Sequence, residues 1–239
     1  MYLKSIGRTE GNRIIKENHY SHTVNTGTKH TLGVFTEEFG LCGVIQLGTG
    51  VNPSKTQNLV RGTEKGEFLE VNRMWLADIL PHNSESKAIS LMFKWLRDNQ
   101  PNVKWLISFA DGVMGKVGTI YQATNWIYTG YNKKGGLWIT KDGERYHPVS
   151  LHLKFGDTKR STLEHHLGTP LYRVVGGQFR YIYFLHKREK KNLLVPSLPY
   201  PKLDNIKDYL LIKKNNWMDE DLWDEFQSIP EPINTNKWF

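Results

Sequence analysis

The sequence predicts a mixed α/β fold built on one main sheet, for three reasons. Short apolar runs of strand character recur along the chain, and segments of helical spacing lie between them. In the central part of the chain the order is strand, helix, strand, helix, which is typical of α/β proteins. With 239 residues, the chain is long enough to bury about 70% of its unfolded surface.

The first elements are a helix and a hairpin. Residues 10–20 favour a short helix. Two apolar runs follow, Leu32 to Phe35 and Leu41 to Leu47, and the residues between them end on a glycine that suits a turn. Residues 49–66 are rich in Gly, Thr, Lys and Asn, so we expect a loop there.

The central unit begins with a strand at Phe68–Leu76, in which apolar and polar residues roughly alternate. From Ser84 to Asp98 the apolar residues fall on one helical face, and Ser84 suits the N-cap position. The mostly apolar run from Val103 to Ala110 is typical of a strand that is buried on both faces. We expect these two strands to be neighbours that splay apart at their ends and form a cleft for a donor.

Further elements follow the central unit. Residues 118–126 predict a short helix. Strands are expected at Trp126 to Tyr131, Leu137 to Thr140 and Phe179 to His186, and the last of these alternates most clearly. Residues 141–178 show no clear pattern.

A boundary is expected near the proline-rich stretch that follows the last strand. Residues 1–190 would form the catalytic domain and residues 191–239 a C-terminal extension. The extension contains Trp217, Trp223 and Trp238, which is too aromatic for a solvated linker. We therefore expect parts of it to pack on the main body.

The charge distribution favours a polyanionic partner such as nucleic acid. The net charge is +8, and residues 1–190 carry 26 Lys and Arg against 16 Asp and Glu, a net of +10. A basic protein without such a partner is the alternative. The one cysteine, Cys42, excludes an internal disulfide and a multi-cysteine zinc site, and its apolar neighbours suggest a core residue rather than a nucleophile.

Two features of the chain bear on its location. No apolar run approaches the roughly 18 residues of a membrane helix. The first residues, MYLKSIGRTEGN, lack the apolar core of a signal peptide. We expect a cytoplasmic protein that makes no contact with a membrane.

Eight short segments of the chain stand out, namely His19-Tyr20-Ser21, LGVF at 32–35, GVIQLG at 43–48, EVNRMWLAD at 70–78, PHNSESKAIS at 81–90, VKWLISFADG at 103–112, GTIYQATNW at 118–126 and RYIYFL at 180–185. In this order they resemble the phage Mom-type DNA-modification proteins. Each segment alone is modest, but the ordered set is specific. It covers most of residues 14–187, and the tail after about residue 200 lies outside it.

The resemblance implies a fold like that of the Gcn5-related N-acetyltransferases, a mixed sheet flanked by helices, here with a C-terminal extension. It also implies an acyltransferase-like enzyme that converts adenine N6 in phage DNA to a methylcarbamoyl-type adenine and so protects the DNA from host restriction. The partner would be double-stranded DNA with a flipped adenine. The enzyme would act in the host cell cytoplasm during infection. The donor would be an acyl-CoA such as acetyl-CoA, or another activated one- or two-carbon unit.

Two residues are candidates for proton transfer. In the acetyltransferase layout a tyrosine on the last helix protonates the departing thiolate, and Tyr121 stands at the matching point. A core tyrosine with a satisfied hydroxyl is the alternative. Asp111 follows the buried strand and could accept the N6 proton, or it could only cap the turn that follows.

Asn72 and Arg73 are candidates in the middle of a strand. A charged arginine among apolar neighbours needs a partner. Arg73 could hold Asp111, a donor carbonyl or a DNA phosphate. A structural ion pair with Glu70 or Asp78 is the alternative.

The candidate donor site is the start of the central helix, at Asn83, Ser84, Ser86 and Lys87. A helix N-terminus favours anions, and Ser86 could present its hydroxyl and backbone N–H to the donor. A capping role is the alternative for Ser86. The segment has no glycine and Glu85 would repel phosphate, which argues against an ordinary pyrophosphate loop and leaves room for another donor.

His19, Tyr20 and His22 are candidate metal ligands. The two histidines would share one face if the first helix continues through them. With no thiolate nearby, iron is more plausible than structural zinc, and Asp111 or Tyr121 could complete the set. Polar surface histidines are the alternative.

Two other functions stay open. One is an ordinary acyl-CoA-dependent N-acetyltransferase, which the glycine-poor donor segment and the basic body disfavour. The other is a catalytically inactive DNA-binding module, which a pocket containing Arg73, Asp111 and Tyr121 would disfavour.

Overall fold

A computed structural model describes the chain except for residues 51, 113–115, 133–135, 177, 203–209 and 213–239. The chain divides into two compact units. Unit 1 comprises Met1–Phe109, Gly118–Gly130 and Arg180–Tyr200, and unit 2 comprises Ala110–Val117, Tyr131–Phe179 and Pro201–Phe239. Trp217, Trp223 and Trp238, on which the expected packing of the extension depends, lie outside the described residues.

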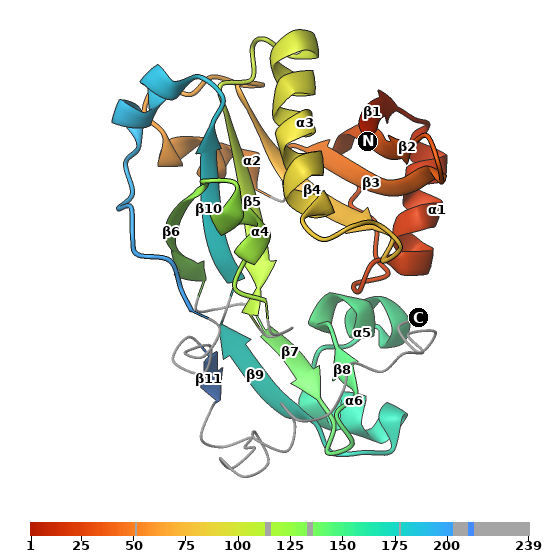
Figure 1. Cartoon of the computed structure of the whole chain (residues 1–239). Coiled ribbons are helices and arrows are strands. Elements are labelled where there is room, and N and C mark those ends of the chain that lie inside the picture. The colour runs from red at the N-terminus through yellow and green to blue at the C-terminus, as the bar shows by residue number, and fades with distance from the viewer. Residues whose placement is uncertain (51, 113–115, 133–135, 177, 203–209, 213–239) are drawn as a thin grey trace. The chain divides into compact units, whose positions relative to one another are not determined.

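A seven-stranded sheet forms the frame of unit 1 (Figure 1). Its order is β1 (Tyr2–Ser5), β2 (Thr28–Thr36), β3 (Gly40–Gly48), β4 (Phe68–Leu76), β5 (Trp105–Asp111), β10 (Gln178–Phe184) and β6 (Ile127–Asn132). The first four strands pair antiparallel, and β4 pairs with β5 in parallel. The predicted mixed α/β class is therefore confirmed.

Helices α1 (Arg8–Asn18) and α3 (Ser84–Asn99) cover opposite faces of this sheet (Figure 1). A Cβ at Gly11 of α1 would meet the Thr31 side chain. The neighbouring strand residue, His30, instead places its ring 5.7 Å from that of Trp95 on α3. Because successive side chains of a strand point to opposite faces, the two helices cannot lie on the same side.

The core of unit 1 is rich in stacked rings. The ring centroids of Phe68 on β4 and Trp105 on β5 lie 4.7 Å apart. The Trp105 indole N–H donates to the Thr63 hydroxyl at 3.1 Å. On α3, the Phe93 ring stacks on Tyr183 of β10 at 3.8 Å. The apolar face predicted for this helix is buried.

Unit 2 has a sheet and a small core of its own. The sheet has the order β11 (Leu210–Ile212), β9 (Tyr172–Gly176), β7 (Gly136–Ile139) and β8 (Arg145–Tyr146). Two helices follow β8, α5 (Pro148–Phe155) and α6 (Arg160–Leu167). A buried cluster joins Leu151 of α5, Leu163 of α6 and Leu171. The helices α5 and α6 and the strands β8 and β9 lie in residues 141–178, where the sequence shows no clear pattern.

The main sequence predictions agree closely with these elements. The hairpin, the strand Phe68–Leu76 and the helix from Ser84 are confirmed. Two predictions are wrong in detail. The loop expected at 49–66 contains α2 (Pro53–Thr56) and the 3-10 turn η1 (Gln57–Leu59), where Asn52 accepts a capping bond from the Lys55 N–H.

The N-cap of α3 is the second correction. It is Asn83, in the left-handed region at φ 66°, rather than Ser84. The Ser84 hydroxyl donates to the Pro81 carbonyl at 2.6 Å, which fixes it inside the preceding turn. The short helix α4 (Thr119–Ala123) lies against α3.

The segment after the 3-10 helix η3 (Lys187–Asn192) runs along unit 1. The Leu198 N–H donates to the Tyr128 carbonyl at 2.9 Å, and the Tyr200 hydroxyl donates to the Trp126 carbonyl at 2.7 Å. Within the described residues, no helix is long and apolar enough to cross a membrane.

Candidate functional site

The candidate site lies where β4 and β5 part in unit 1. The parallel pairing of the two strands ends at Glu70 and Ile107, although β4 continues to Leu76 and β5 to Asp111. The two strands are neighbours that diverge (Figure 1), as the sequence predicted. Where the two strands separate, the backbone hydrogen bonds between them end, and polar side chains can lie between the strands.

Tyr121 is held on α4 by a cage of aromatic rings. Its ring lies 5.1 Å from Trp126 and 5.3 Å from Tyr181, and the side chain is only 8% exposed. The helix that carries it begins after Gly118, which takes a left-handed φ of 83°. Burial raises the pKa of Tyr121, although a hydrogen bond from Ser108 acts in the opposite direction.

Ser108 is a site residue that the sequence analysis missed. It is fully buried on β5, and its hydroxyl oxygen lies 2.7 Å from the Tyr121 oxygen and 3.0 Å from the Val71 carbonyl oxygen of β4. One clue was present in the sequence, because Ser108 carries the only hydroxyl in the apolar run VKWLISFA. The partner of that hydroxyl depends on the sheet register and on the position of α4, so the sequence could not show it.

Glu70 is the second residue that was missed as part of the site. Its carboxylate is largely buried, and burial raises its pKa to about 7 although the positive charge of Arg73 acts to lower it. The loop at Gly50 packs directly on the carboxylate, since a Cβ at that position would collide with it. An acidic residue within a mostly buried strand was the available clue.

Arg73 is anchored by backbone oxygens. Its Nε donates to the Thr23 carbonyl at 2.9 Å, and one terminal nitrogen donates to the Asn72 carbonyl at 2.7 Å. Among the described residues it forms no ion pair with Glu70 or Asp78, the two alternatives considered from sequence. Its charge therefore acts on Glu70 without a direct contact.

Asn72 offers an unused acceptor. The side-chain amide donates to the Thr28 hydroxyl at 3.5 Å, while the buried Oδ1 atom has no hydrogen-bond partner among the described residues. A buried polar atom without a partner is uncommon in a folded protein. An N–H donor is the chemical class that this oxygen would accept.

The predicted donor residues lie together at the start of α3. Asn83 forms no side-chain cap, so its side chain does not occupy the N-terminal N–H groups of the helix. These N–H groups and Lys87 fit an anionic group. Two facts oppose a pyrophosphate, namely the acidic Glu85 in the first turn and the bond that turns the Ser84 hydroxyl back to Pro81.

His19 and His22 do not have the geometry that was expected of two metal ligands on one helical face. Helix α1 ends at Asn18, His19 has extended backbone, and His22 takes a φ of 46°, so the histidines do not share a helical face. Both are buried, at 6% exposure, so the surface alternative is also wrong. The His22 Nδ1 lies 2.7 Å from the Lys16 carbonyl oxygen, and the His19 Nδ1 lies 2.8 Å from the Ser21 hydroxyl.

Tyr20 stands beside this pair, with its ring 4.3 Å from that of His19. Within the part of the chain that the structure describes, no three His, Cys, Asp or Glu side chains are grouped as a metal site requires. An iron site at these residues stays a prediction.

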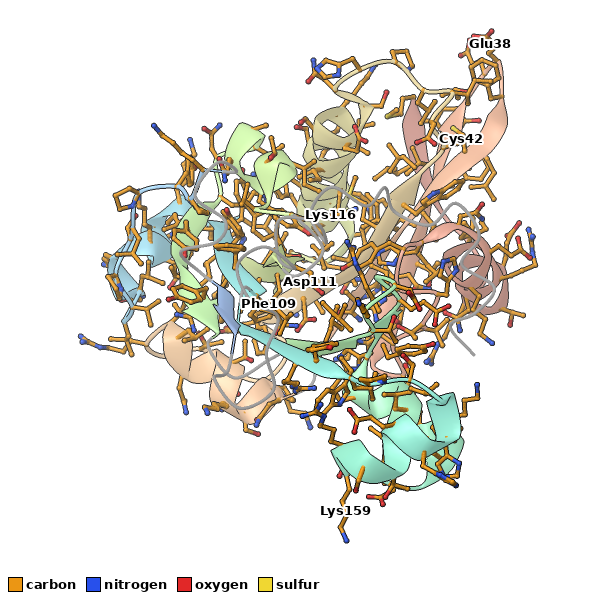
Figure 2. The ribbon with its side chains drawn as sticks, turned by 90° about the horizontal axis from the view of Figure 1, so that it is seen from below. Glu38, Cys42, Phe109, Asp111, Lys116 and Lys159 are labelled. Atoms are coloured by element: carbon orange, nitrogen blue, oxygen red, sulfur yellow. The ribbon has the colours of Figure 1, made fainter. Side chains whose placement is uncertain are left out.

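Asp111 belongs to unit 2, whereas Arg73 and Tyr121 belong to unit 1. Its carbonyl accepts a bond from the Lys116 N–H at 3.1 Å, and both residues are labelled in Figure 2. The expected pocket of Arg73, Asp111 and Tyr121 therefore stays a prediction as far as Asp111 is concerned.

Two solved structures are similar to this chain at a distance. One is the GphF GNAT-like decarboxylase in complex with isobutyryl-CoA, with 8% identity, a TM-score of 0.44, and coverage of 77% of this chain and all of that chain. The other is the aminoglycoside 6'-N-acetyltransferase from Enterococcus faecium, with 8% identity, a TM-score of 0.34, and coverage of 84% and 100%.

Sequence comparison gives the nearer relationship. The chain is 39% identical over 194 residues to the "Methylcarbamoylase mom" of Escherichia phage Mu, which covers 79% of this chain and 78% of that protein. The sequence model of the Mom protein family matches residues 1–202. The resemblance carried by the eight ordered segments is thus confirmed, and the chain belongs to the Mom protein family.

Proposed function

We propose that this chain is a DNA-modifying transferase that converts adenine N6 in phage DNA to a methylcarbamoyl-type adenine and so protects the DNA from host restriction. The observation that carries the proposal is membership of the Mom family, with 39% identity to the phage Mu methylcarbamoylase. The net charge of +10 on residues 1–190 suits a DNA partner. The enzyme would act in the host cytoplasm during infection.

The substrate sets demanding conditions. Adenine N6 is a weak nucleophile because its lone pair is delocalised into the ring, so transfer requires an activated donor and precise orientation. The amino group also lies inside the duplex, and flipping the base out costs about a few kcal/mol. Double-stranded DNA would therefore be held by its phosphates while one adenine enters the site.

The residues at the parting of β4 and β5 supply the groups that such a transfer needs. Tyr121 carries a hydroxyl that can protonate the leaving atom of the donor. The free Oδ1 of Asn72 can accept an N–H of the adenine amino group. Glu70, with its pKa raised to about 7 by burial, is poised to take the proton that N6 loses. Arg73, held by the Thr23 carbonyl, would position these groups.

The donor would bind at the start of α3, at Asn83, Ser84, Ser86 and Lys87. An acyl-CoA such as acetyl-CoA, or another activated one- or two-carbon unit, would supply the activated carbonyl carbon when bound. Acetyl transfer alone gives N6-acetyladenine, so a methylcarbamoyl product requires a donor unit that also carries nitrogen. The acidic Glu85 favours a donor that places little negative charge there. An isothermal titration with acetyl-CoA, compared between the wild type and Lys87→Ala, tests this part of the proposal.

An iron ion at His19, Tyr20 and His22 remains part of the proposal because an imidazole and a phenol already lie side by side there. Soft thiolates are absent, which suits iron better than structural zinc. Metal analysis of the purified protein and of a His22→Ala variant tests it directly. Asp111 stays a candidate for a third ligand or for a proton acceptor.

The test of the function is the loss of product in Tyr121→Phe. Removing the hydroxyl while keeping the packed ring should reduce modified adenine by roughly 10² or more, the usual scale of general acid–base help. Mass spectrometry of nucleosides from cells that express each variant measures this. The matched control is Tyr2→Phe, at a tyrosine that is 38% exposed and far along the chain from the site.

Other outcomes of the same experiment favour the alternatives. A product that is plain N-acetyladenine would indicate an ordinary acyl-CoA-dependent N-acetyltransferase. DNA binding without any new nucleoside would indicate an inactive DNA-binding module. Near wild-type product from Tyr121→Phe would refute the role assigned to the hydroxyl.

A further inference from the structure

Ser108 and Tyr121 form a buried pair of hydroxyl groups in unit 1. Their oxygen atoms lie 2.7 Å apart, and the Ser108 oxygen also lies 3.0 Å from the carbonyl oxygen of Val71. Ser108 is fully buried and Tyr121 is 8% exposed, so water does not easily compete for these contacts. The Ser108 hydroxyl of β5 thus lies within hydrogen-bond distance of two oxygens, the Val71 carbonyl oxygen of β4 and the Tyr121 hydroxyl oxygen of α4.

Ser108 has one proton and two acceptors within reach. The Val71 carbonyl can only accept a hydrogen bond, whereas the Tyr121 hydroxyl can both donate and accept. If Ser108 donates to Val71, Tyr121 must donate to Ser108. If Ser108 turns to Tyr121, the Tyr121 proton is released to point elsewhere. Only this second arrangement leaves that proton available for transfer.

The same arrangement matters once the proton has left. A phenolate enclosed by the rings of Trp126 and Tyr181 would be a buried charge, which is costly without a partner. A hydrogen bond from Ser108 to that phenolate is charge-assisted, and such bonds are about twice as strong as neutral ones. The bond from Ser108 therefore lowers the pKa of Tyr121, against the larger effect of burial and the smaller effect of the Glu70 charge, both of which raise it.

We infer that Ser108 is a positioning residue for Tyr121. Its hydroxyl turns from the Val71 carbonyl to the Tyr121 oxygen and holds the phenolate after Tyr121 has given up its proton. This inference rests on the proposed function, in which Tyr121 is the acid. No sequence pattern assigns such a role to Ser108, and only the contact across β4, β5 and α4 shows it.

The step balances when the activated donor carries the whole methylcarbamoyl-type group that is transferred. A bond forms between adenine N6 and the carbonyl carbon of the activated donor, and the bond from that carbon to the leaving atom breaks with its electron pair. The leaving atom takes the Tyr121 proton. The proton that N6 loses passes to Glu70 and from there restores the Tyr121 hydroxyl, and Ser108 can then return to the Val71 carbonyl.

The first test measures the Tyr121 proton directly and needs no DNA. Fluorotyrosine is incorporated into the whole chain, and the resonance of Tyr121 is identified as the one that Tyr121→Phe loses. Ser108→Ala should then increase the proton affinity of Tyr121 by roughly tenfold or more, which is one pH unit or more in its titration midpoint. An unchanged midpoint would overturn the inference.

The matched control is Cys42→Ala. Cys42 is buried on β3, and its thiol donates to the Val34 carbonyl of the neighbouring strand at 3.5 Å, the same kind of strand-to-strand bond without a tyrosine (Figure 2). This variant should leave the Tyr121 titration at its wild-type midpoint. A shift equal to that of Ser108→Ala would mean that general loosening of the sheet, and not the hydroxyl, sets the midpoint.

The second test is a double-mutant cycle on the rate of DNA modification. Ser108→Ala alone should slow product formation by roughly tenfold or more, and Ser108→Thr, which keeps the hydroxyl, should recover most of that loss. In the Tyr121→Phe background, Ser108→Ala should have no further effect. Equal losses in both backgrounds would show that Ser108 acts independently of Tyr121 and would overturn the inference.

The two tests separate the inference from the proposed function. If the wild type produces no modified adenine, the proposed function fails. The titration of Tyr121 still decides whether Ser108 supports its phenolate.

Discussion

Replacing Glu70 with glutamine should stabilise the protein at neutral pH and leave it unchanged in acid. The carboxylate is largely buried beneath the Gly50 loop, and its pKa rises from an ordinary 4.5 to about 7. The folded state therefore holds a proton that the unfolded state has already lost. As the pH rises from 4.5 to about 7, the free energy of unfolding must fall, and above pH 7 the loss is complete.

The size of the effect follows from that pKa difference. At about 1.4 kcal/mol for each unit of pKa, the rise from 4.5 to about 7 corresponds to about 3.5 kcal/mol. Glu70→Gln removes the charge at every pH, so its stability should exceed that of the wild type by up to this amount at pH 8 and by almost nothing near pH 4.5. For a chain of this length, each kcal/mol corresponds to about 2–4 °C in Tm.

Denaturant unfolding of both proteins at several pH values between 4.5 and 8 measures this difference. Glu38→Gln is the control, since Glu38 is exposed at the tip of the β2–β3 hairpin (Figure 2), where the carboxylate stays in water. Other groups that titrate in this range contribute equally to both proteins and cancel in the comparison. Stability curves that run parallel for the wild type and Glu70→Gln would refute the reasoning.

Three further predictions concern the Gly50 loop, the DNA partner and Asp111. Gly50→Ala should destabilise the fold by about 1–3 kcal/mol, because the φ of Gly50 is +74° and a Cβ there would collide with Glu70. Gly62→Ala is the control, since Gly62 has a similar φ of +71° but open space around it, and it should cost less in the same unfolding assay. DNA affinity should fall steeply with salt, with a log–log slope of about −0.9 for each phosphate contacted, and a flat salt titration would argue against DNA as the partner. Asp111→Asn should reduce modified adenine in nucleoside analysis while unfolding stays near wild type, and full activity would remove Asp111 from the mechanism.

The parts of the fold that were predicted from sequence are those with a long, regular pattern. The helix from Ser84 buries one face, so its apolar residues recur at the helical period. The hairpin was recognised from its apolar runs and the strand Phe68–Leu76 from a rough alternation in a mostly apolar run, and these strands are buried on both faces of the sheet. The helices α5 and α6 were missed because each has only eight residues. Their buried cluster takes Leu151 and Leu163 from the helices and Leu171 from beyond them, which no local pattern shows.

The candidate site was predicted in part for a similar reason. Tyr121, Asn72 and Arg73 stand in segments that resemble a family, and all three lie in unit 1, with Asn72 and Arg73 on β4 beyond its last pair with β5. The importance of Ser108 and Glu70 depends on cross-strand register, on the position of α4 and on burial. These are long-range properties that a single sequence does not display.

The histidines illustrate the opposite error. His19 and His22 were expected to share a helical face or to lie on the surface, but helix α1 ends one residue before His19. Hydrogen bonds to Ser21 and to the Lys16 carbonyl then allow both rings to be buried. Short polar contacts of this kind override the periodicity on which the expectation depended.

The most direct test of the central claim is to locate the added group on the DNA base. DNA from cells that express the wild-type chain, grown with ¹⁵N-labelled adenine, is digested to nucleosides and analysed by tandem mass spectrometry. The proposed function predicts a heavier deoxyadenosine whose added mass remains with the labelled N6 nitrogen on fragmentation, and which is nearly absent with Tyr121→Phe. Unmodified deoxyadenosine, or an added group on any other atom, would contradict the assignment of this chain as an adenine N6 transferase.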